Sequence, residues 1–426
     1  MCNKRSDKKS PEQILSERKI GLPKLRTYLP LWLWAKLISI RDRVKFVYHF
    51  DRKTMKGKQV LLLCDHACRS IFFYTFAGYP FVRLNAVTER ANWFRFPRFF
   101  LFLDGGCIPV KRFHSDLPAL RNIFRVFSMG GSVLLFPEGI QSFDGTTMPV
   151  PKSTAGLIRM AGVTVVLCRS HGMFFGEPDF GKYRRRGHRE MHYEILFTKE
   201  ELKELSEEEI YGRLMDRFSY NEHRWNLAAG YSYTSRRGLA EGLENLLYRC
   251  PVCGAEFHMK SDGDLFRCTA CSNTLKMKPQ YVFTPAEEKD RVIFPTIDRW
   301  CEEQRKKVRE EVSRPDFSVS YACRVYTINN KHLTGDPFLP LGEGSVTISR
   351  EGIRYTGTLD GEKTDRVFDL KDIPLFARTK AIRANDFYDG GVRYYFSPTE
   401  NENRTEKYRL IAEELAKIQP TGVRYR

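Results

Sequence analysis

Short apolar segments alternate with helical segments in the first half of the chain, and this alternation constrains the fold more than any other feature. The apolar segments are KQVLLLC (58–64), GSVLLF (131–136) and VTVVLC (163–168), while residues 118–131 and 153–162 have helical patterns. Strands that alternate with helices along a sequence form parallel sheets with helices on their faces. The sequence therefore predicts an α/β domain, and 426 residues leave room for further domains.

The N-terminal segment is expected to be a basic arm followed by an amphipathic helix. Residues 1–25 are polar and basic, and within residues 28–46 the side chains Leu33, Leu37 and Ile40 recur at helical spacing. Two tryptophans and flanking arginines favour a helix that lies in a membrane interface, because amphipathic aromatic rings and cations suit the headgroup layer. The alternative is an ordinary helix packed on its own domain.

The second half of the chain has a different composition. From Phe317 onward, strand-like segments lead to a helical segment in which Tyr408, Ile411 and Leu415 share one stripe. Strands followed by one amphipathic helix outline a small β-rich domain that resembles the pleckstrin-homology (PH) domain or a similar small barrel. The expected order is a basic arm with an interfacial helix (1–50), an α/β domain (51–225), a linker helix (226–247), a cysteine module (248–278), a charged helical linker (279–314) and a β-rich domain with a C-terminal helix (315–426).

The net charge of +18 comes entirely from the first half of the chain. Residues 1–200 contain 34 lysines and arginines against 16 acidic residues, whereas residues 201–426 contain 36 of each. A basic excess attracts anionic lipid or nucleic acid, but the many aromatic residues between Phe72 and Phe102 favour a membrane surface. No apolar run reaches the ~18 residues that span a bilayer. We therefore expect a cytoplasmic protein that is peripheral on the inner face of the cell membrane.

Four of the eleven cysteines are arranged as two C-x-x-C pairs. Cys250 and Cys253 are separated by fourteen residues from Cys268 and Cys271. This spacing predicts a zinc ribbon, since each pair can present two thiolates to one tetrahedral zinc ion. The alternative is a pair of redox motifs. Because four protein ligands leave no open position on the metal, the zinc is expected to be structural.

Three other segments carry residue types suited to chemistry. His66 follows the strand at 58–64, and a neutral imidazole at the carboxyl end of a strand can act as a general base. Lys111 and Arg112 form a cationic pair suited to a phosphate. Glu138 lies in a tight turn after the next apolar segment and presents a carboxylate as a hydrogen-bond acceptor.

The order of these segments resembles the 1-acyl-glycerol-3-phosphate acyltransferase family over residues 55–225. The matching blocks are DHACRSI (65–71), GCIPVKR (106–112), FPEGIQS (136–142) and VTVV (163–166). The resemblance implies a lipid acyltransferase fold with His66 as the general base. It also implies that Lys111 and Arg112 hold the acceptor's phosphate. The substrate-binding turn would consist of Phe136, Pro137, Glu138 and Gly139.

One position departs from the family pattern in a way that matters for catalysis. The family has an aspartate five residues after the histidine, where this chain has Ile71. In the serine protease triad, loss of the orienting carboxylate costs about 10⁴ in rate. Asp65, Glu89 and Asp104 are the nearest carboxylates in the sequence that could compensate.

The resemblance implies acyl transfer from acyl-CoA or acyl-carrier protein to a hydroxyl of a lysophospholipid such as 1-acyl-glycerol-3-phosphate. Because of Ile71, the alternative is an inactive adaptor that binds lipid or acyl-thioester. Such an adaptor would recruit a protein partner through the ribbon or the C-terminal domain. Nucleic-acid binding is disfavoured, because the ribbon lies in the neutral half of the chain.

Overall fold

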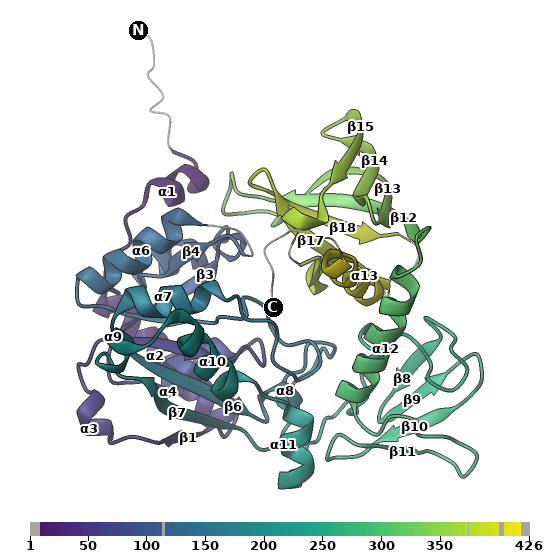
Figure 1. Cartoon of the computed structure of the whole chain (residues 1–426), viewed down its shortest axis with the longest axis horizontal. Coiled ribbons are helices and arrows are strands. Elements are labelled where there is room, and N and C mark those ends of the chain that lie inside the picture. Colours follow the sequence, from purple (N-terminus) through teal and green to yellow (C-terminus); the bar gives the residue numbers. More distant parts are fainter. Residues whose placement is uncertain (1–8, 113–115, 374, 400–403, 419–426) are drawn as a thin grey trace.

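The computed structural model describes residues 9–112, 116–373, 375–399 and 404–418, and within these ranges it contains three sheets (Figure 1). The first half of the chain forms one sheet with helices, a small sheet follows, and the third sheet lies near the C-terminus. The mixed α/β fold that the sequence predicted is confirmed at this level.

The N-terminal sheet has seven strands. Strands β2 to β6 run parallel to one another, whereas β7 is antiparallel to β6 and β1 is parallel to β7. In spatial order the strands are β1 (Lys45–Tyr48), β7 (Glu190–Phe197), β6 (Thr164–His171), β2 (Val60–Cys64), β5 (Ser132–Leu135), β3 (Leu84–Glu89) and β4 (Ile108–Val110).

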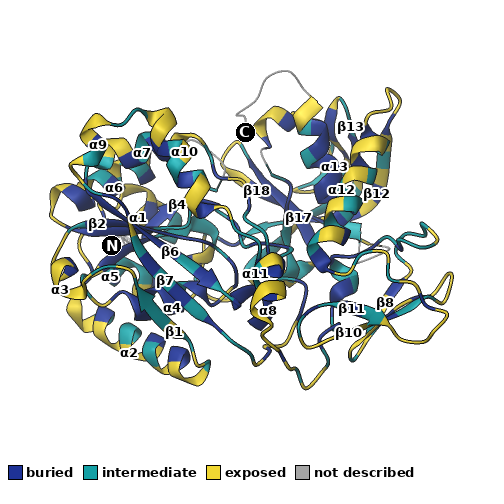
Figure 2. Ribbon diagram, turned by 60° about the horizontal axis from the view of Figure 1, so that its bottom comes forward, coloured by how far each residue is buried: buried dark blue, intermediate teal, exposed yellow. Residues whose placement is uncertain are grey.

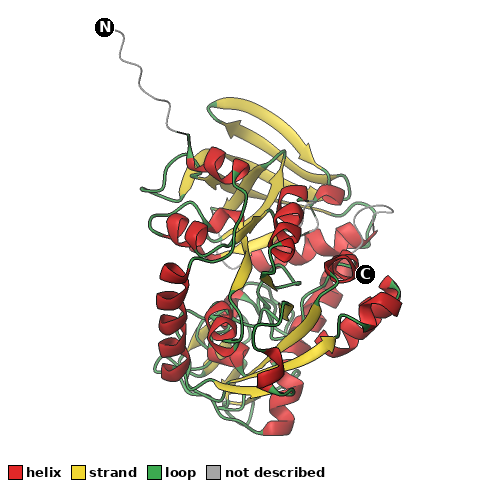
Figure 3. Cartoon of the chain, turned by 90° about the vertical axis from the view of Figure 1, so that its left-hand side faces the viewer, coloured by secondary structure: helices red, strands yellow, loops and turns green. Residues whose placement is uncertain are grey.

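Helices cover both faces of this sheet (Figure 3), and each face has its own apolar core. Side chains alternate across a strand, so Leu62 of β2 packs with α2 and α4, whereas Leu61 and Leu63 pack with α6, α7 and α10. The helices of this part are α1 (Pro11–Glu17), α2 (Leu25–Arg41), α3 (Arg52–Met55), α4 (Ile71–Gly78), α5 (Arg98–Asp104), α6 (Leu117–Ser128), α7 (Ser153–Ala161), α8 (Met173–Gly176), α9 (Glu201–Glu204), α10 (Glu207–Phe218) and α11 (Glu222–Ala229).

The N-terminal segment is more ordered than the expected basic arm. Helix α1 begins with a capping box between Ser10 and Gln13, and Leu15 and Ile20 are buried against the rest of the protein. Strand β1 precedes residue 51 yet pairs with β7, so the N-terminal sheet begins before the expected boundary. Residues 1–8 lie outside the described part of the chain.

The structure does not have the linker helix that the sequence predicted over residues 226–247. Helix α11 ends at Ala229, and the rest of the segment is irregular apart from a 3₁₀ turn at Leu243–Asn245. Gly230, Gly238 and Gly242 have positive φ angles, which a right-handed helix does not allow. These glycines end the helix and keep it from resuming.

The small sheet consists of antiparallel strands that contain or flank the four cysteines. Helix α12 (Ile297–Val312) follows it and is not a free spacer, because Trp300 packs against Phe266 and Phe283 of the sheet. Figure 1 shows α12 between the small sheet and the C-terminal sheet. In spatial order the strands are β11 (Phe283–Pro285), β10 (Thr274–Met277), β9 (Leu265–Cys268) and β8 (Met259–Asp262).

The C-terminal sheet has seven antiparallel strands and is closed by helix α13 (Thr405–Ile418). Tyr408, Ile411 and Leu415 of α13 are all buried in the core of this sheet, as the sequence stripe predicted. The first strand pairs with the last. In spatial order the strands are β15 (Glu362–Phe368), β14 (Gly352–Leu359), β13 (Phe338–Ser349), β12 (Ser318–Ile328), β18 (Val392–Pro398), β17 (Ala384–Asp389) and β16 (Ala377–Thr379).

Among the helices in the described part of the chain, none combines the length and the apolar character needed to cross a bilayer.

Candidate functional site

The residues singled out in the sequence gather at one edge of the N-terminal sheet. His66 follows β2, the turn at 136–139 follows β5, and Lys111 and Arg112 follow β4. Because these strands are parallel, their carboxyl ends meet at the same edge, which is where α/β sheets build their sites.

Glu138 holds the loop that carries His66. One oxygen of its carboxylate accepts the backbone N–H of His66 at 2.6 Å, and the other accepts the backbone N–H of Met148 at 2.6 Å. The side chain is buried, and burial raises the pKa of Glu138 to about 8, although both backbone hydrogen bonds act to lower it. Gly139 has a φ of +66°, which lets the chain turn directly after this glutamate. The Glu138 carboxylate is therefore a positioning group for His66.

The imidazole of His66 is half-buried and stands 5.0 Å from the ring of Phe136, measured between ring centroids. Burial lowers the pKa of His66 to about 4, and the positive charge of Arg112 lowers it further in the same direction. The imidazole is thus neutral at physiological pH. Within the described residues its Nδ1 atom is buried without a hydrogen-bond partner.

The three carboxylates that could compensate for Ile71 make other contacts. Asp65 accepts hydrogen bonds from the backbone N–H and the hydroxyl of Ser170, at 3.0 and 2.9 Å. Asp104 pairs with Lys24 and Arg26 at the start of α2. Since Glu89 pairs with Arg112, none of the three hydrogen-bonds to His66.

Arg112 is held by carboxylates from two sheets. Its guanidinium pairs with Glu89 at the end of β3, and Asp386 Oδ1 of β17 lies 3.7 Å from its Nη2 atom. Burial would raise the pKa of Glu89, but Arg112 and Arg393 together lower it below its ordinary value. Lys111 lies against Gly391, in the turn between β17 and β18.

No sequence pattern predicts these partners of Arg112. Asp386 and Arg393 follow Arg112 by more than 270 residues, and no motif or spacing connects them. From the sequence alone, Glu89 is expected only as a carboxylate that could compensate for Ile71 beside His66. Its position at the end of a strand next to β4 is the one feature that could have placed it near Arg112.

The four cysteines form a separate cluster. The Sγ atoms of Cys250, Cys253, Cys268 and Cys271 all lie within 4.8 Å of one another. The Cys250–Cys271 and Cys253–Cys268 sulfur distances are both 3.8 Å. Zinc–sulfur bonds of about 2.3 Å at tetrahedral angles require sulfur atoms about 3.8 Å apart. The donor set therefore fits a tetrahedral zinc ion.

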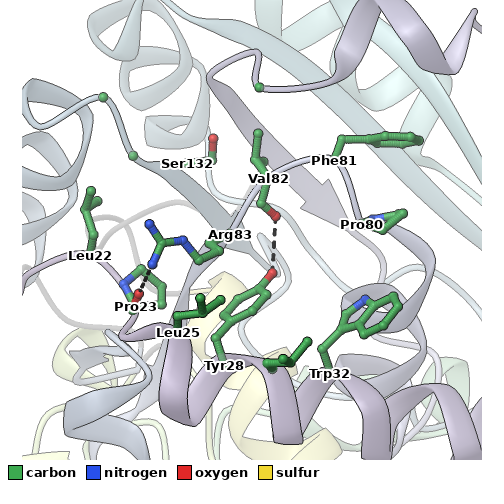
Figure 4. A pocket seen from close by; sticks show the side chains of 14 residues that line it. Leu22, Pro23, Leu25, Tyr28, Trp32, Pro80, Phe81, Val82, Arg83 and Ser132 are labelled. Carbon is green, nitrogen blue, oxygen red and sulfur yellow. Dashed lines mark hydrogen bonds between the residues drawn. The ribbon is translucent and has the colours of Figure 1, made fainter.

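A hollow of about 570 Å³ lies at the opposite edge of the N-terminal sheet (Figure 4). Its lining includes Arg83, just before β3, and Ser132, the first residue of β5, so it faces the amino ends of these strands. Leu25, Leu29 and Trp32 of α2 line its other side. The hollow is therefore separate from the edge that carries His66.

The apolar stripe of α2 faces away from the protein. Leu33, Leu37 and Ile40 are 50%, 65% and 70% exposed, whereas Ala35 and Ile38 on the other side are buried. Figure 2 shows this exposed face along α2. An ordinary surface helix turns its apolar stripe inward, so α2 has the opposite arrangement.

Comparisons with known proteins add little to the family resemblance that the sequence blocks carry. No protein-family model matches the chain, and a search of curated proteins finds no significant match. A search of solved structures matches the crystal structure of the 1-acyl-sn-glycerophosphate (LPA) acyltransferase PlsC from Thermotoga maritima. The match has 14% sequence identity and a TM-score of 0.35, and it covers 43% of this chain and 78% of that chain. A TM-score of this size does not establish a shared fold.

Proposed function

We propose that the chain is an acyltransferase that moves an acyl chain from acyl-CoA or acyl-carrier protein to a hydroxyl of a lysophospholipid such as 1-acyl-glycerol-3-phosphate. The observation that carries this proposal is the convergence of His66, the turn with Glu138, and the pair Lys111–Arg112 at one sheet edge. These are the blocks through which the sequence resembles the 1-acyl-glycerol-3-phosphate acyltransferase family.

In the proposed mechanism the neutral imidazole of His66 takes the proton from the acceptor hydroxyl. The hydroxyl oxygen attacks the carbonyl carbon of the thioester, the carbon–sulfur bond breaks, and the imidazolium returns the proton to the leaving thiolate. Lys111 and Arg112 would hold the acceptor's phosphate. Phe136, Pro137 and Gly139 would line the acceptor beside His66, while Glu138 holds the His66 loop through its backbone N–H.

The test of this proposal is transfer of a labelled acyl group to 1-acyl-glycerol-3-phosphate by the purified chain and by His66→Ala. We expect the variant to lose activity by at least about 10²-fold, the usual contribution of a general base. Because the pKa of His66 is about 4, the imidazole stays unprotonated on acidification to about pH 5, and the base is lost only as the pH falls through 4. Equal product from both proteins would remove His66 as the base.

A second candidate function is an inactive adaptor that binds lipid or acyl-thioester. It is favoured by one observation, which is that no carboxylate in the described part of the chain supports His66 Nδ1. The same assay separates the two candidates, since an adaptor would bind the acyl-thioester without forming any product over a panel of acceptors.

We also propose that α2 docks the protein on an anionic membrane surface at the cytoplasmic, inner face of the cell membrane. The outward apolar stripe supports this, and the basic excess of the first 200 residues supplies the attraction to anionic lipid. The hollow beside Leu25 and Leu29 opens next to the same stripe.

Membrane docking predicts that Leu37→Glu combined with Ile40→Glu abolishes binding to anionic vesicles at low salt. Burial of each side chain is worth about 1.5–3 kcal/mol, so the affinity should fall by about a hundredfold or more. The matched control is Leu227→Glu on α11, which is 57% exposed and outside the stripe. If the double variant still co-sediments with vesicles as the unmodified chain does, α2 is not the docking element.

For the remaining parts we propose a structural zinc ion in the four-cysteine cluster and a PH-like topology for the C-terminal sheet. The zinc would fix the two C-x-x-C turns and would leave no position for substrate. The strand order and the closing helix α13 support the second proposal. Either part could bind a protein partner. Residues 201–426, which contain both parts, have equal numbers of basic and acidic residues, so nothing in their charge favours nucleic acid.

A further inference from the structure

The C-terminal sheet lies over the two cations proposed to receive the acceptor's phosphate. Strands β17 and β18 lie on the side of that sheet that faces the N-terminal sheet (Figure 2). Asp386 Oδ1 lies 3.7 Å from Arg112 Nη2, and a Cβ atom placed on Gly391 would lie 3.5 Å from Lys111 Nζ. Both cations therefore meet the same pair of strands.

The contact is reciprocal, because each sheet contributes one anion and one cation. Glu89 of β3 accepts a hydrogen bond from the Tyr388 hydroxyl at 2.6 Å and lies 3.4 Å from Arg393 Nη1. Arg393 also pairs with Asp386 at 2.6 Å within the C-terminal sheet. Two guanidinium groups thus face two carboxylates.

The balance of charge in this group opposes the binding of a further anion. Asp386 and Arg393 are buried, and the side chains of Glu89 and Arg112 are only 9% and 18% exposed. A phosphate that entered the closed group would lose its hydration and would face two carboxylates as well as two guanidiniums. The phosphate can pair with Arg112 only when Asp386 has moved away.

The remaining contacts between the C-terminal and N-terminal units are both polar and apolar. The Phe96 backbone N–H donates to the Leu333 carbonyl at 2.8 Å, and Asp179 pairs with Lys380 at 3.2 Å. The Leu333 side chain packs on the core of the N-terminal sheet. Units of one chain that meet through a mixed interface of this kind are expected to move relative to one another, unless the interface is large and mainly hydrophobic.

We propose that the C-terminal sheet is a built-in lid that competes with a phosphomonoester for Lys111 and Arg112. In the closed arrangement Asp386 takes the place of the ligand's phosphate beside Arg112. When the phosphomonoester binds, the lid opens. The identity of the ligand rests on the proposed function, whereas the closure itself rests only on the contacts between the sheets.

The test uses the full chain and two variants that weaken the lid without touching Lys111 or Arg112. Tyr388→Phe removes the hydrogen bond to Glu89 but keeps the ring that stacks on Arg393, and Leu333→Ser removes an apolar contact. The control is Val367→Ser, since Val367 is 51% exposed on β15. Binding is measured with inorganic phosphate, glycerol 3-phosphate and lysophosphatidic acid, and opening is measured by hydrogen exchange of residues 106–112.

We expect both variants to exchange these amides faster and to bind the phosphomonoester about tenfold more tightly, because a larger fraction of the protein is open. The control should change neither quantity. Tighter binding of glycerol 3-phosphate as well as lysophosphatidic acid would assign the effect to the phosphomonoester, whereas an effect with inorganic phosphate alone would overturn the ligand assignment.

Faster exchange without tighter binding would overturn the competition, and unchanged exchange in both folded variants would overturn the lid. If one variant does not fold, the other still decides. Acyl transfer is read separately in the same proteins. Equal acyl transfer by the unmodified chain and by His66→Ala would count against the proposed function and leave the exchange result standing.

Discussion

Replacing Cys268 by serine is expected to release the metal and to unfold the small sheet. Structural zinc contributes about 10–16 kcal/mol of apparent binding free energy in zinc-finger peptides, which is comparable to the total stability of about 5–15 kcal/mol of an ordinary domain. The small sheet has only four short strands, and Phe266 lies in a core that the sheet shares with Phe175 and Tyr233. Metal analysis should find about one zinc per chain before the substitution and almost none after it.

The unfolding has a local reporter in Trp300. Its ring packs on Phe266 and Phe283, and its indole N–H donates to the Arg249 carbonyl at 2.9 Å. We expect Trp300 to become exposed to solvent, which fluorescence can follow together with hydrogen exchange of residues 259–277. Cys301→Ser is the matched control, because Cys301 lies on α12 outside the cluster. A metal-free chain in which these amides stay protected would contradict the structural role.

The local elements of the N-terminal sheet could be predicted because their signals are local. The run VLLLC forms β2 and the stretch at 153–162 forms α7, each within a few residues of the expected bounds. Apolar periodicity depends only on neighbouring positions, so it survives without knowledge of the partner strands. The same holds for the C-x-x-C pairs, whose spacing already fixes which sulfur atoms can share one metal.

What could not be predicted depends on contacts between distant segments. The stripe of α2 predicts the helix but leaves two orientations open, an interfacial helix or one packed on its own domain, and the structure has Leu37 and Ile40 outward. The pairing of Arg112 with Glu89 and Asp386 joins three strands of two sheets, and charged residues in strands carry no signal of their partners. The resemblance to a family likewise placed Glu138 in the site, but not its role in holding the His66 backbone.

His66 has a low proton affinity because burial and the charge of Arg112 outweigh the backbone hydrogen bonds that favour its charged form. A pKa of about 4 keeps the imidazole neutral, but it also makes the imidazole a weak base, since general bases work best with a pKa near the working pH. The Nδ1 atom has no acceptor among the described residues. Position 71, which opens α4 five residues after His66, is where the resembling family has the missing aspartate.

We therefore expect Ile71→Asp to raise the pKa of His66 and to increase acyl transfer by up to about 10⁴-fold, the effect of the orienting carboxylate in the protease triad. The expected direction follows from charge, because a carboxylate favours the protonated imidazole and so raises its pKa. Ile71→Asn is the matched control, since its amide oxygen can accept a hydrogen bond from Nδ1–H but carries no charge. The measurements are the imidazole titration by NMR and the rate with lysophosphatidic acid.

The two readouts separate basicity from catalysis. Ile71 is fully buried, so the aspartate also loses apolar packing, and a lower thermal stability is expected in both variants. A folded Ile71→Asp protein with a raised His66 pKa and no gain in transfer would show that basicity does not limit the reaction, which would favour the inactive adaptor. An unchanged pKa would instead show that position 71 does not reach the imidazole. In that case the missing aspartate would not explain the weak base, and only the burial and the nearby charge of Arg112 would remain as its causes.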